Sequence, residues 1–182
     1  MSQTNSTTYT GIAIIFHWLI ALLFFTAFPL GIYMADLPLS PTKLQLYSYH
    51  KWIGITVLML AILRVLWRIS HRPPALPASL PRWQQIATHA EHHSLYLLLL
   101  LIPISGWLMS SAKGFQTVWF GILPLPDLVA KNKALGNFLQ ETHELLNFTL
   151  MGLVSLHILA ALKHHFIDHD GILVRMLSTR PR

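Results

Sequence analysis

Eleven histidines stand out in this chain of 182 residues, and four of them lie inside or at the edge of apolar segments. His17 lies in IIFHWLI, His50 lies in YSYHKWIG, and His143 and His157 bracket HELLNFTLMGLVSLH. Histidine is the commonest metal ligand among side chains, and an ionisable group inside a membrane segment is costly enough to suggest a function. On a helix, His143 and His157 would lie about 21 Å apart along the axis and about 40° apart around it. They share a face but not one small ion, so they mark either two sites or two ordinary buried histidines.

Four apolar segments could position these histidines across a membrane. The composition is 53% hydrophobic and only 11% charged, whereas a soluble domain carries about 25% charged residues. About 20 apolar residues cross a bilayer as a helix, and helices satisfy their own backbone polar groups. We therefore expect an all-α membrane protein with a four-transmembrane-helix bundle, forming a single domain over residues 1–182. The predicted spans are 11–34, 48–69, 89–111 and 143–166.

The basic residues divide unequally between the two sides of this predicted bundle. Every arginine falls on one side, and cytoplasmic loops are enriched in Lys and Arg, so both termini are predicted to be cytoplasmic. The external loop between the last two spans, residues 113–140, is long, and residues 127–140 could form a short interfacial helix. The cytoplasmic set is Arg64, Arg68, Arg72, Arg82, Lys163, Arg175, Arg180 and Arg182, and the external set is Lys43, Lys51, Lys113, Lys131 and Lys133.

With this orientation the four intramembrane histidines match in depth as two pairs. His50 and His143 lie on the outer side, and His17 and His157 lie on the inner side. Two stacked bis-histidine pockets in a helix bundle are what two haem groups require, because each iron takes one axial imidazole from either side. The alternative is that each histidine only forms a hydrogen bond to a neighbouring helix.

Six of the other seven histidines gather at the predicted cytoplasmic ends of the last two spans, and His71 belongs to the basic connector after the second span. His89 and His92 share a helix face and could replace an inner ligand, bind a metal or line a quinone pocket. His164 lies about 10 Å beyond His157 on roughly the same face, which suits proton transfer beside an inner cofactor. Exposed helix ends are the simpler interpretation of both groups. A histidine-lined metal carrier or sensor is a third possibility, and it would use His89, His92, His93, His164, His165 and His169.

Several other classes of protein are excluded or disfavoured. The chain has no cysteine, which excludes disulfides, thiolate metal sites and covalent haem attachment. The net charge of +6 is dispersed along the chain, which does not favour nucleic-acid binding.

From about residue 10 to residue 177, the sequence resembles the bacterial cytochrome b561 family of small quinone-linked dihaem membrane proteins. The resemblance rests on motifs in order: HW at His17, a histidine opening the second span at His50, H-x-x-H at His89 and His92, and HE at His143. His157 and the segment HHFIDHDGILVRM, which contains His164, His165, Asp170, Leu173, Arg175 and Met176, complete the pattern.

This resemblance implies two b-type haems, with His17 and His157 ligating the inner iron and His50 and His143 the outer one. It implies a multi-pass protein of the bacterial inner membrane that oxidises superoxide outside and reduces ubiquinone near the cytoplasmic face. His164, His89, His92 and Arg175 are the candidates for holding the quinone, and the external lysines could focus an anion. The alternative function is an electron-transfer and anchor subunit of a separate dehydrogenase, hydrogenase or periplasmic haem protein.

Overall fold

The computed structural model describes residues 8–76 and 80–177, and its four long helices account for most of them. The helices are α1 (Gly11–Asp36), α2 (Pro41–Ser70), α3 (Arg82–Ala112) and α4 (Lys133–Lys163). The remaining elements are a hairpin of β1 (Val118–Trp119) with β2 (Leu123–Pro124), a π-helix η1 (His164–Asp168) and a 3₁₀ turn η2 (Val174–Met176).

Polar side chains fix where three of the helices begin. The side-chain oxygens of Thr10, Ser40 and Asn132 accept hydrogen bonds from backbone N–H groups in the first turns of α1, α2 and α4. Such caps satisfy N–H groups that have no partner inside the helix. At the end of α1, Lys43 donates to the carbonyl oxygens of Ala35 and Leu37, at 3.0 and 2.5 Å. A cation at a helix C-terminus also complements the helix dipole.

Four membrane-length helices were predicted, and the described residues contain four that are long and apolar enough to span a bilayer. Three of them begin earlier than predicted, because apolar content marks only the part of a helix inside hydrocarbon. The predicted external loop over 113–140, with a separate interfacial helix at 127–140, is therefore wrong. Residues 133–140 are the first turns of α4, since the Asn132 cap starts that helix, and the loop is 113–132.

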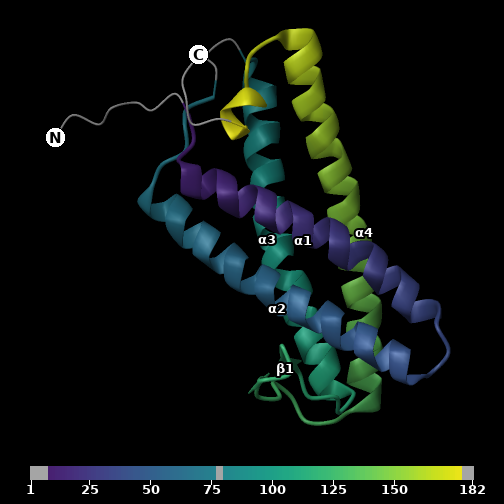
Figure 1. Cartoon of the computed structure of the whole chain (residues 1–182). Helices are drawn as coiled ribbons and strands as arrows, with labels where there is room; N and C mark the ends of the chain where they lie inside the picture. The colour runs from purple at the N-terminus through teal and green to yellow at the C-terminus, as the bar shows by residue number, and fades with distance from the viewer. Residues whose placement is uncertain (1–7, 77–79, 178–182) are drawn as a thin grey trace.

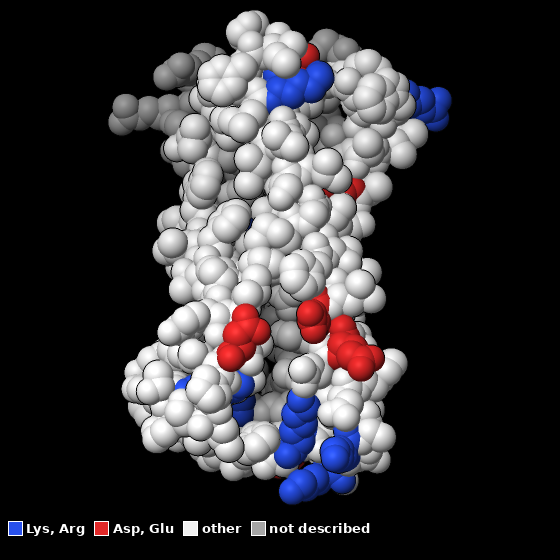
Figure 2. Space-filling model, turned by 90° about the vertical axis from the view of Figure 1, so that its right-hand side faces the viewer, with Lys and Arg blue, Asp and Glu red and all other residues white. Residues whose placement is uncertain are grey.

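The helices form two hairpins, α1 with α2 and α3 with α4, which pack against each other (Figure 1). The hairpins meet in an apolar cluster of Phe24 from α1, Leu98 and Ile102 from α3, and Leu150 from α4. On the face shown in Figure 2, lysine and arginine side chains gather at the two ends, acidic side chains lie next to the lower basic group, and the middle of the surface is mostly uncharged. Many exposed side chains on the helices, including Leu22, Leu66 and Leu159, are apolar, as a lipid-facing surface requires.

The loop between α3 and α4 is folded onto the end of α2. Trp52 donates to the carbonyl oxygen of Val118 at 2.7 Å, and Trp119 donates to Thr56 Oγ1 at 3.2 Å. Lys51 reaches the carbonyl oxygens of Phe115 and Gln116, at 3.2 and 3.4 Å. These contacts hold the loop as a cap over one end of the bundle. Among the described residues, the hairpin within this loop is the one departure from the all-α prediction.

The segment after α4 turns back beneath the opposite end of the bundle. The turn occurs at His169, whose φ of 53° is left-handed. Trp18 in α1 then donates to the carbonyl oxygen of Met176 at 2.8 Å. Arg175 donates to the carbonyl oxygen of Ala75, in the connector after α2, at 3.0 Å. The C-terminal segment therefore joins α1 to the connector between α2 and α3 at this end.

Candidate functional site

The imidazoles of His50 and His143 face each other near the end of the bundle covered by the α3–α4 loop. His50 comes from α2 and His143 from α4, and their ring centroids are 6.2 Å apart. Two imidazoles on opposite sides of one metal ion, each with a metal–nitrogen distance of about 2 Å, would have centroids about 6 Å apart. The separation therefore suits a shared metal ion.

A cavity of about 830 Å³ surrounds this pair, here called the outer pair after its predicted side of the membrane. The cavity is lined by all four helices and the α3–α4 loop, and its walls include Phe28, Trp107 and Phe148. Ligand cavities usually range from about 300 to 1,000 Å³ and are lined mainly by apolar side chains. The space is therefore sufficient for a large planar cofactor with mainly apolar edges.

Two glycines on the neighbouring helices make room for the outer imidazoles. A Cβ atom on Gly106 of α3 would lie 3.0 Å from His143 Cε1, and one on Gly31 of α1 would lie 3.2 Å from His50 Cε1. Both distances are tighter than ordinary carbon–carbon contact. A glycine inside a helix costs about 1 kcal/mol relative to alanine, so close approach of a ring explains why glycine stands at both positions.

The hydrogen bonds at His143 orient its ring for a ligand in the cavity. Its Nδ1 lies 3.0 Å from the carbonyl oxygen of Ile102 and 3.0 Å from Ser105 Oγ. Because the carbonyl can only accept, Nδ1 carries the proton and Nε2 is left as a free donor atom for a metal. Nδ1 of His50 is buried without a hydrogen bond of regular geometry, although the Ala27 backbone faces it.

His17 of α1 and His157 of α4 form a second pair, and their ring centroids are also 6.2 Å apart. Nδ1 of His157 lies 3.5 Å from Glu91 Oε2 of α3, and the ring of His92 stands 5.4 Å from that of His157. Nδ1 of His17 lies 3.2 Å from Arg64 Nη2 of α2. The structure thus brings together the four histidines in the two predicted pairs, and His92 lies beside the inner one.

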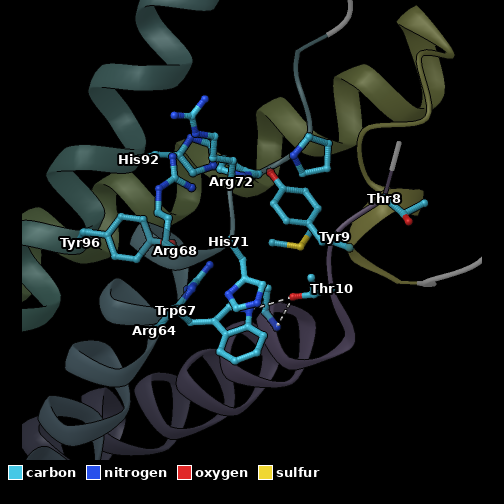
Figure 3. A pocket seen from close by; sticks show the side chains of 14 residues that line it. Thr8, Tyr9, Thr10, Arg64, Trp67, Arg68, His71, Arg72, His92 and Tyr96 are labelled. Atoms are coloured by element: carbon cyan, nitrogen blue, oxygen red, sulfur yellow. Dashed lines mark hydrogen bonds between the residues drawn. The ribbon is translucent and has the colours of Figure 1, made fainter. Parts of the chain in front are cut away.

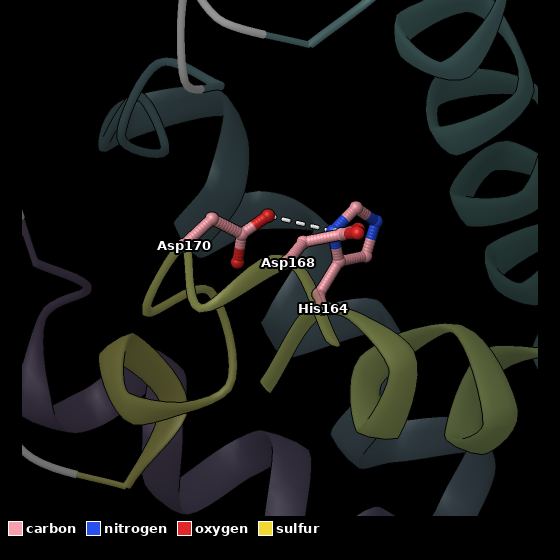
Figure 4. Close-up of side chains that lie close together, drawn as sticks. All are labelled: His164, Asp168 and Asp170. Carbon is pink, nitrogen blue, oxygen red and sulfur yellow. Dashed lines mark ion pairs between the residues drawn. The ribbon is translucent and has the colours of Figure 1, made fainter. Parts of the chain in front are cut away.

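The other predicted quinone-binding residues do not form one cluster with His92. His164 lies in η1 with its Nδ1 3.0 Å from Asp168 Oδ2 and 2.6 Å from Asp170 Oδ2 (Figure 4). Arg175 contacts Ala75, and His89 is exposed on α3, where its carbonyl accepts from His93.

In the described part of the chain, one group of three side chains could hold a metal ion. This group consists of His164, Asp168 and Asp170. None of the other five histidines of the predicted metal carrier joins it. Lys163 Nζ, 2.5 Å from Asp168 Oδ2, already places a positive charge there. The arrangement therefore gives little support to a metal carrier.

The lysines that were predicted to be external form contacts within the protein as well as contributing charge. Lys43 and Lys51 donate to backbone carbonyls, and Lys113 donates to Gln140 Oε1. Burial lowers the pKa of Lys113, which follows α3. These contacts leave the positive charges of the lysines at this end of the bundle, where they would attract an anion.

The sequence reasoning did not identify the residues that support the histidines. Gly31, Gly106, Ser105 and Glu91 act through contacts between helices, which spacing along one helix does not reveal. The two glycines carried a detectable signal, because each interrupts a long apolar helix where alanine would be more favourable.

The fold is that of a multi-pass helical membrane protein, and its bundle contains two pairs of facing histidines. The family model described as prokaryotic cytochrome b561 matches residues 8–179. The chain belongs to this family, and it is a membrane electron-transfer protein of bacterial type.

Two relatives extend over nearly the whole chain. Cytochrome b561 homolog 2 of Escherichia coli (strain K12) is 38% identical over 98% of this chain and 96% of its own length. Probable superoxide oxidase CybB of Yersinia pestis is 30% identical over 94% of this chain and 97% of its own length. The family implies a b-type haem, and the outer pair, its cavity and its glycines fit one.

Proposed function

We propose that the protein is a dihaem b-type cytochrome of the bacterial inner membrane that transfers electrons from superoxide outside to ubiquinone near the cytoplasmic face. The facing of His50 with His143 and of His17 with His157 is the observation that carries the proposal. The relative named as a probable superoxide oxidase supports the choice of donor. The bias of arginine toward one side supports cytoplasmic termini.

The four histidines would hold the two haem irons through their Nε2 atoms. The haems, when bound, would supply reversible one-electron chemistry. His143 and His157 share α4, fourteen residues apart, so the helix sets the two sites about 21 Å apart along its axis. Ile102 and Ser105 fix the His143 ring, and Glu91 faces Nδ1 of His157. Such contacts set the orientation and basicity of a metal-ligating imidazole.

The reaction needs an anion outside and protons inside. Two superoxide ions are oxidised to two O₂, and ubiquinone takes up two electrons and two protons to form the quinol. Lys43, Lys51 and Lys113 supply positive charge at the external end. His164 would hold a proton on Nδ1 between Asp168 and Asp170, and it remains our first candidate for delivering protons to the quinone.

The test uses the isolated full-length protein in vesicles that contain ubiquinone, with superoxide generated enzymatically. We expect quinol to form faster than in protein-free vesicles, and superoxide dismutase should abolish the difference. His50→Ala should abolish it as well. Quinol formation no faster than the spontaneous rate would refute superoxide as the donor.

A second candidate function is that of an electron-transfer and anchor subunit. The external loop carries exposed apolar side chains, Phe115, Phe120 and Ile122, the last 85% exposed, which suit contact with a partner dehydrogenase or periplasmic haem protein. This candidate predicts a protein that contains haem but oxidises no superoxide alone. Copurification of a stoichiometric partner, lost when Phe115 and Ile122 are changed to Ser, would favour it.

A further inference from the structure

Three arginines lie near the end of the bundle that the C-terminal segment covers. Arg64 and Arg68 are four residues apart on one face of α2, and Arg72 follows just beyond the end of that helix at Ser70. They line a small pocket with Tyr96 and His92 of α3 on one side and Tyr9 on the other (Figure 3). Arg64 and Arg68 are half-buried, and Arg72 is exposed.

These arginines lack an anionic partner in the part of the chain that the structure describes. The ion pairs there join carboxylates only to His157, His164 and Lys163. Arg64 and Arg68 stack instead on the same ring, that of Tyr96, with guanidinium carbons 5.1 and 5.4 Å from its centroid. Two like charges on one aromatic ring at membrane depth are costly unless an anion accompanies them.

The nearby tyrosine does not supply this anion. Burial raises the pKa of Tyr9, so its phenol stays protonated at neutral pH. Asp168 and Asp170 are already paired with His164, and Glu91 faces His157. The anion must therefore come from a bound group.

The position of Arg64 indicates which bound group this is. Its guanidinium can only donate, so its contact with His17 Nδ1 requires an unprotonated Nδ1. A histidine that binds iron through Nε2 carries its proton on Nδ1 instead. Iron ligation by His17 would therefore displace Arg64 from this nitrogen and leave its guanidinium free for an anion beside the inner site.

The pocket favours a small group over a ring. Its volume is about 40 Å³, whereas a cavity that holds one water molecule has roughly 10–15 Å³. That space suits a carboxylate and is too small for a quinone ring. His92 lines the pocket and stands against His157, so the pocket adjoins the inner histidine pair.

We propose that Arg64 and Arg68 bind the propionate carboxylates of the inner haem, an inference that rests on the proposed function. Guanidinium is suited to this because it presents a fork of N–H donors to both oxygens of a carboxylate. Two other cations near this end of the bundle, Lys163 and Arg175, are engaged elsewhere, with Asp168 and the carbonyl oxygen of Ala75. Tyr96 would then act as a positioning residue that holds the two guanidinium groups side by side.

The test compares haem with haem dimethyl ester, in which both carboxylates are blocked. Apo-protein is reconstituted in nanodiscs with either porphyrin, and loss of the inner haem to an excess of apo-globin is followed optically. The proteins are wild type, Arg64→Gln, Arg68→Gln, and Arg82→Gln as a control with an exposed arginine at the start of α3.

With haem, Arg64→Gln and Arg68→Gln should each weaken haem binding at the inner site by roughly 10- to 100-fold. This is the change in affinity expected from the loss of one charge-assisted hydrogen bond. The dimethyl ester should weaken binding to wild type in the same way, and Arg64→Gln should then cause no further loss. The outer haem and the Arg82→Gln control should be unchanged.

Three outcomes would overturn the inference. Equal retention of haem and its ester by wild type would overturn it while leaving the proposed function intact. A loss that follows the anionic lipid content of the nanodisc instead of the ester would assign the arginines to a lipid phosphate. A wild-type protein that binds no haem would overturn the proposed function and the inference together.

Discussion

Gly106→Ala should weaken the outer haem site without affecting the inner one. The added Cβ would lie 3.0 Å from His143 Cε1 and 3.3 Å from its Nδ1. The ring cannot retreat freely, because Nδ1 is held 3.0 Å from both the Ile102 carbonyl oxygen and Ser105 Oγ. A shift of a few tenths of an ångström would therefore stretch these contacts or move the ring out of line with the iron.

The expected size follows from two opposing effects. Overpacking of this kind costs about 1–3 kcal/mol, and replacing glycine by alanine within a helix returns about 1 kcal/mol. The net loss is about 0–2 kcal/mol, which corresponds to at most about a 30-fold loss of haem affinity at the outer site. Gly31→Ala, with a contact of 3.2 Å to His50 Cε1, should have a smaller effect.

Gly152→Ala is the matched control, because a Cβ at that position on α4 would meet nothing within 4 Å. The assay is the haem-to-protein ratio after purification, together with haem loss to a scavenger and the thermal midpoint. We expect haem retention to fall in the order Gly152→Ala, Gly31→Ala, Gly106→Ala. If Gly106→Ala retained both haems as well as the control, the close approach of His143 would have no bearing on cofactor binding.

Three further predictions concern the histidine pairs and the external charge. His17→Ala should reduce the haem-to-protein ratio from two to one, and loss of neither haem would refute the pairing. Glu91→Gln should raise the midpoint potential of the inner haem in an optical redox titration, because it removes a negative charge 3.5 Å from His157 Nδ1 that stabilises oxidised iron; a lower potential would contradict this. The rate of reaction with superoxide should fall as salt is added, because salt screens Lys43, Lys51 and Lys113; a rate independent of salt would show that these lysines do not attract the anion.

The four helices could be predicted because the thickness of the bilayer sets the length of the apolar segment that crosses it. The starts of three of them could not be predicted; Ser40 and Asn132, for example, cap turns that project beyond the apolar stretch. The depth of His17, His50, His143 and His157 followed from helical rise, which is why the structure brings them together in the predicted pairs.

The surroundings of each histidine were less predictable because they depend on contacts between helices. Nothing along α2 alone indicates that Arg64 meets His17, or that Arg64 and Arg68 share Tyr96. Likewise, the external lysines looked free for steering an anion. In the structure, Lys51 donates hydrogen bonds to the carbonyl oxygens of Phe115 and Gln116 and so holds the loop in place. The sequence does not show that the loop folds back to this lysine.

The division of the bundle into two hairpins bears on how the protein assembles in the membrane. His17 and His50 belong to the α1–α2 hairpin, and His143 and His157 belong to α4 of the other hairpin. Each haem iron would thus link the α1–α2 hairpin to the α3–α4 hairpin. The α1–α2 hairpin comes first in the chain and would enter the membrane first. Cofactor delivery would then complete the tertiary structure, and protein made under haem starvation should present two loosely associated hairpins to the cell's proteases.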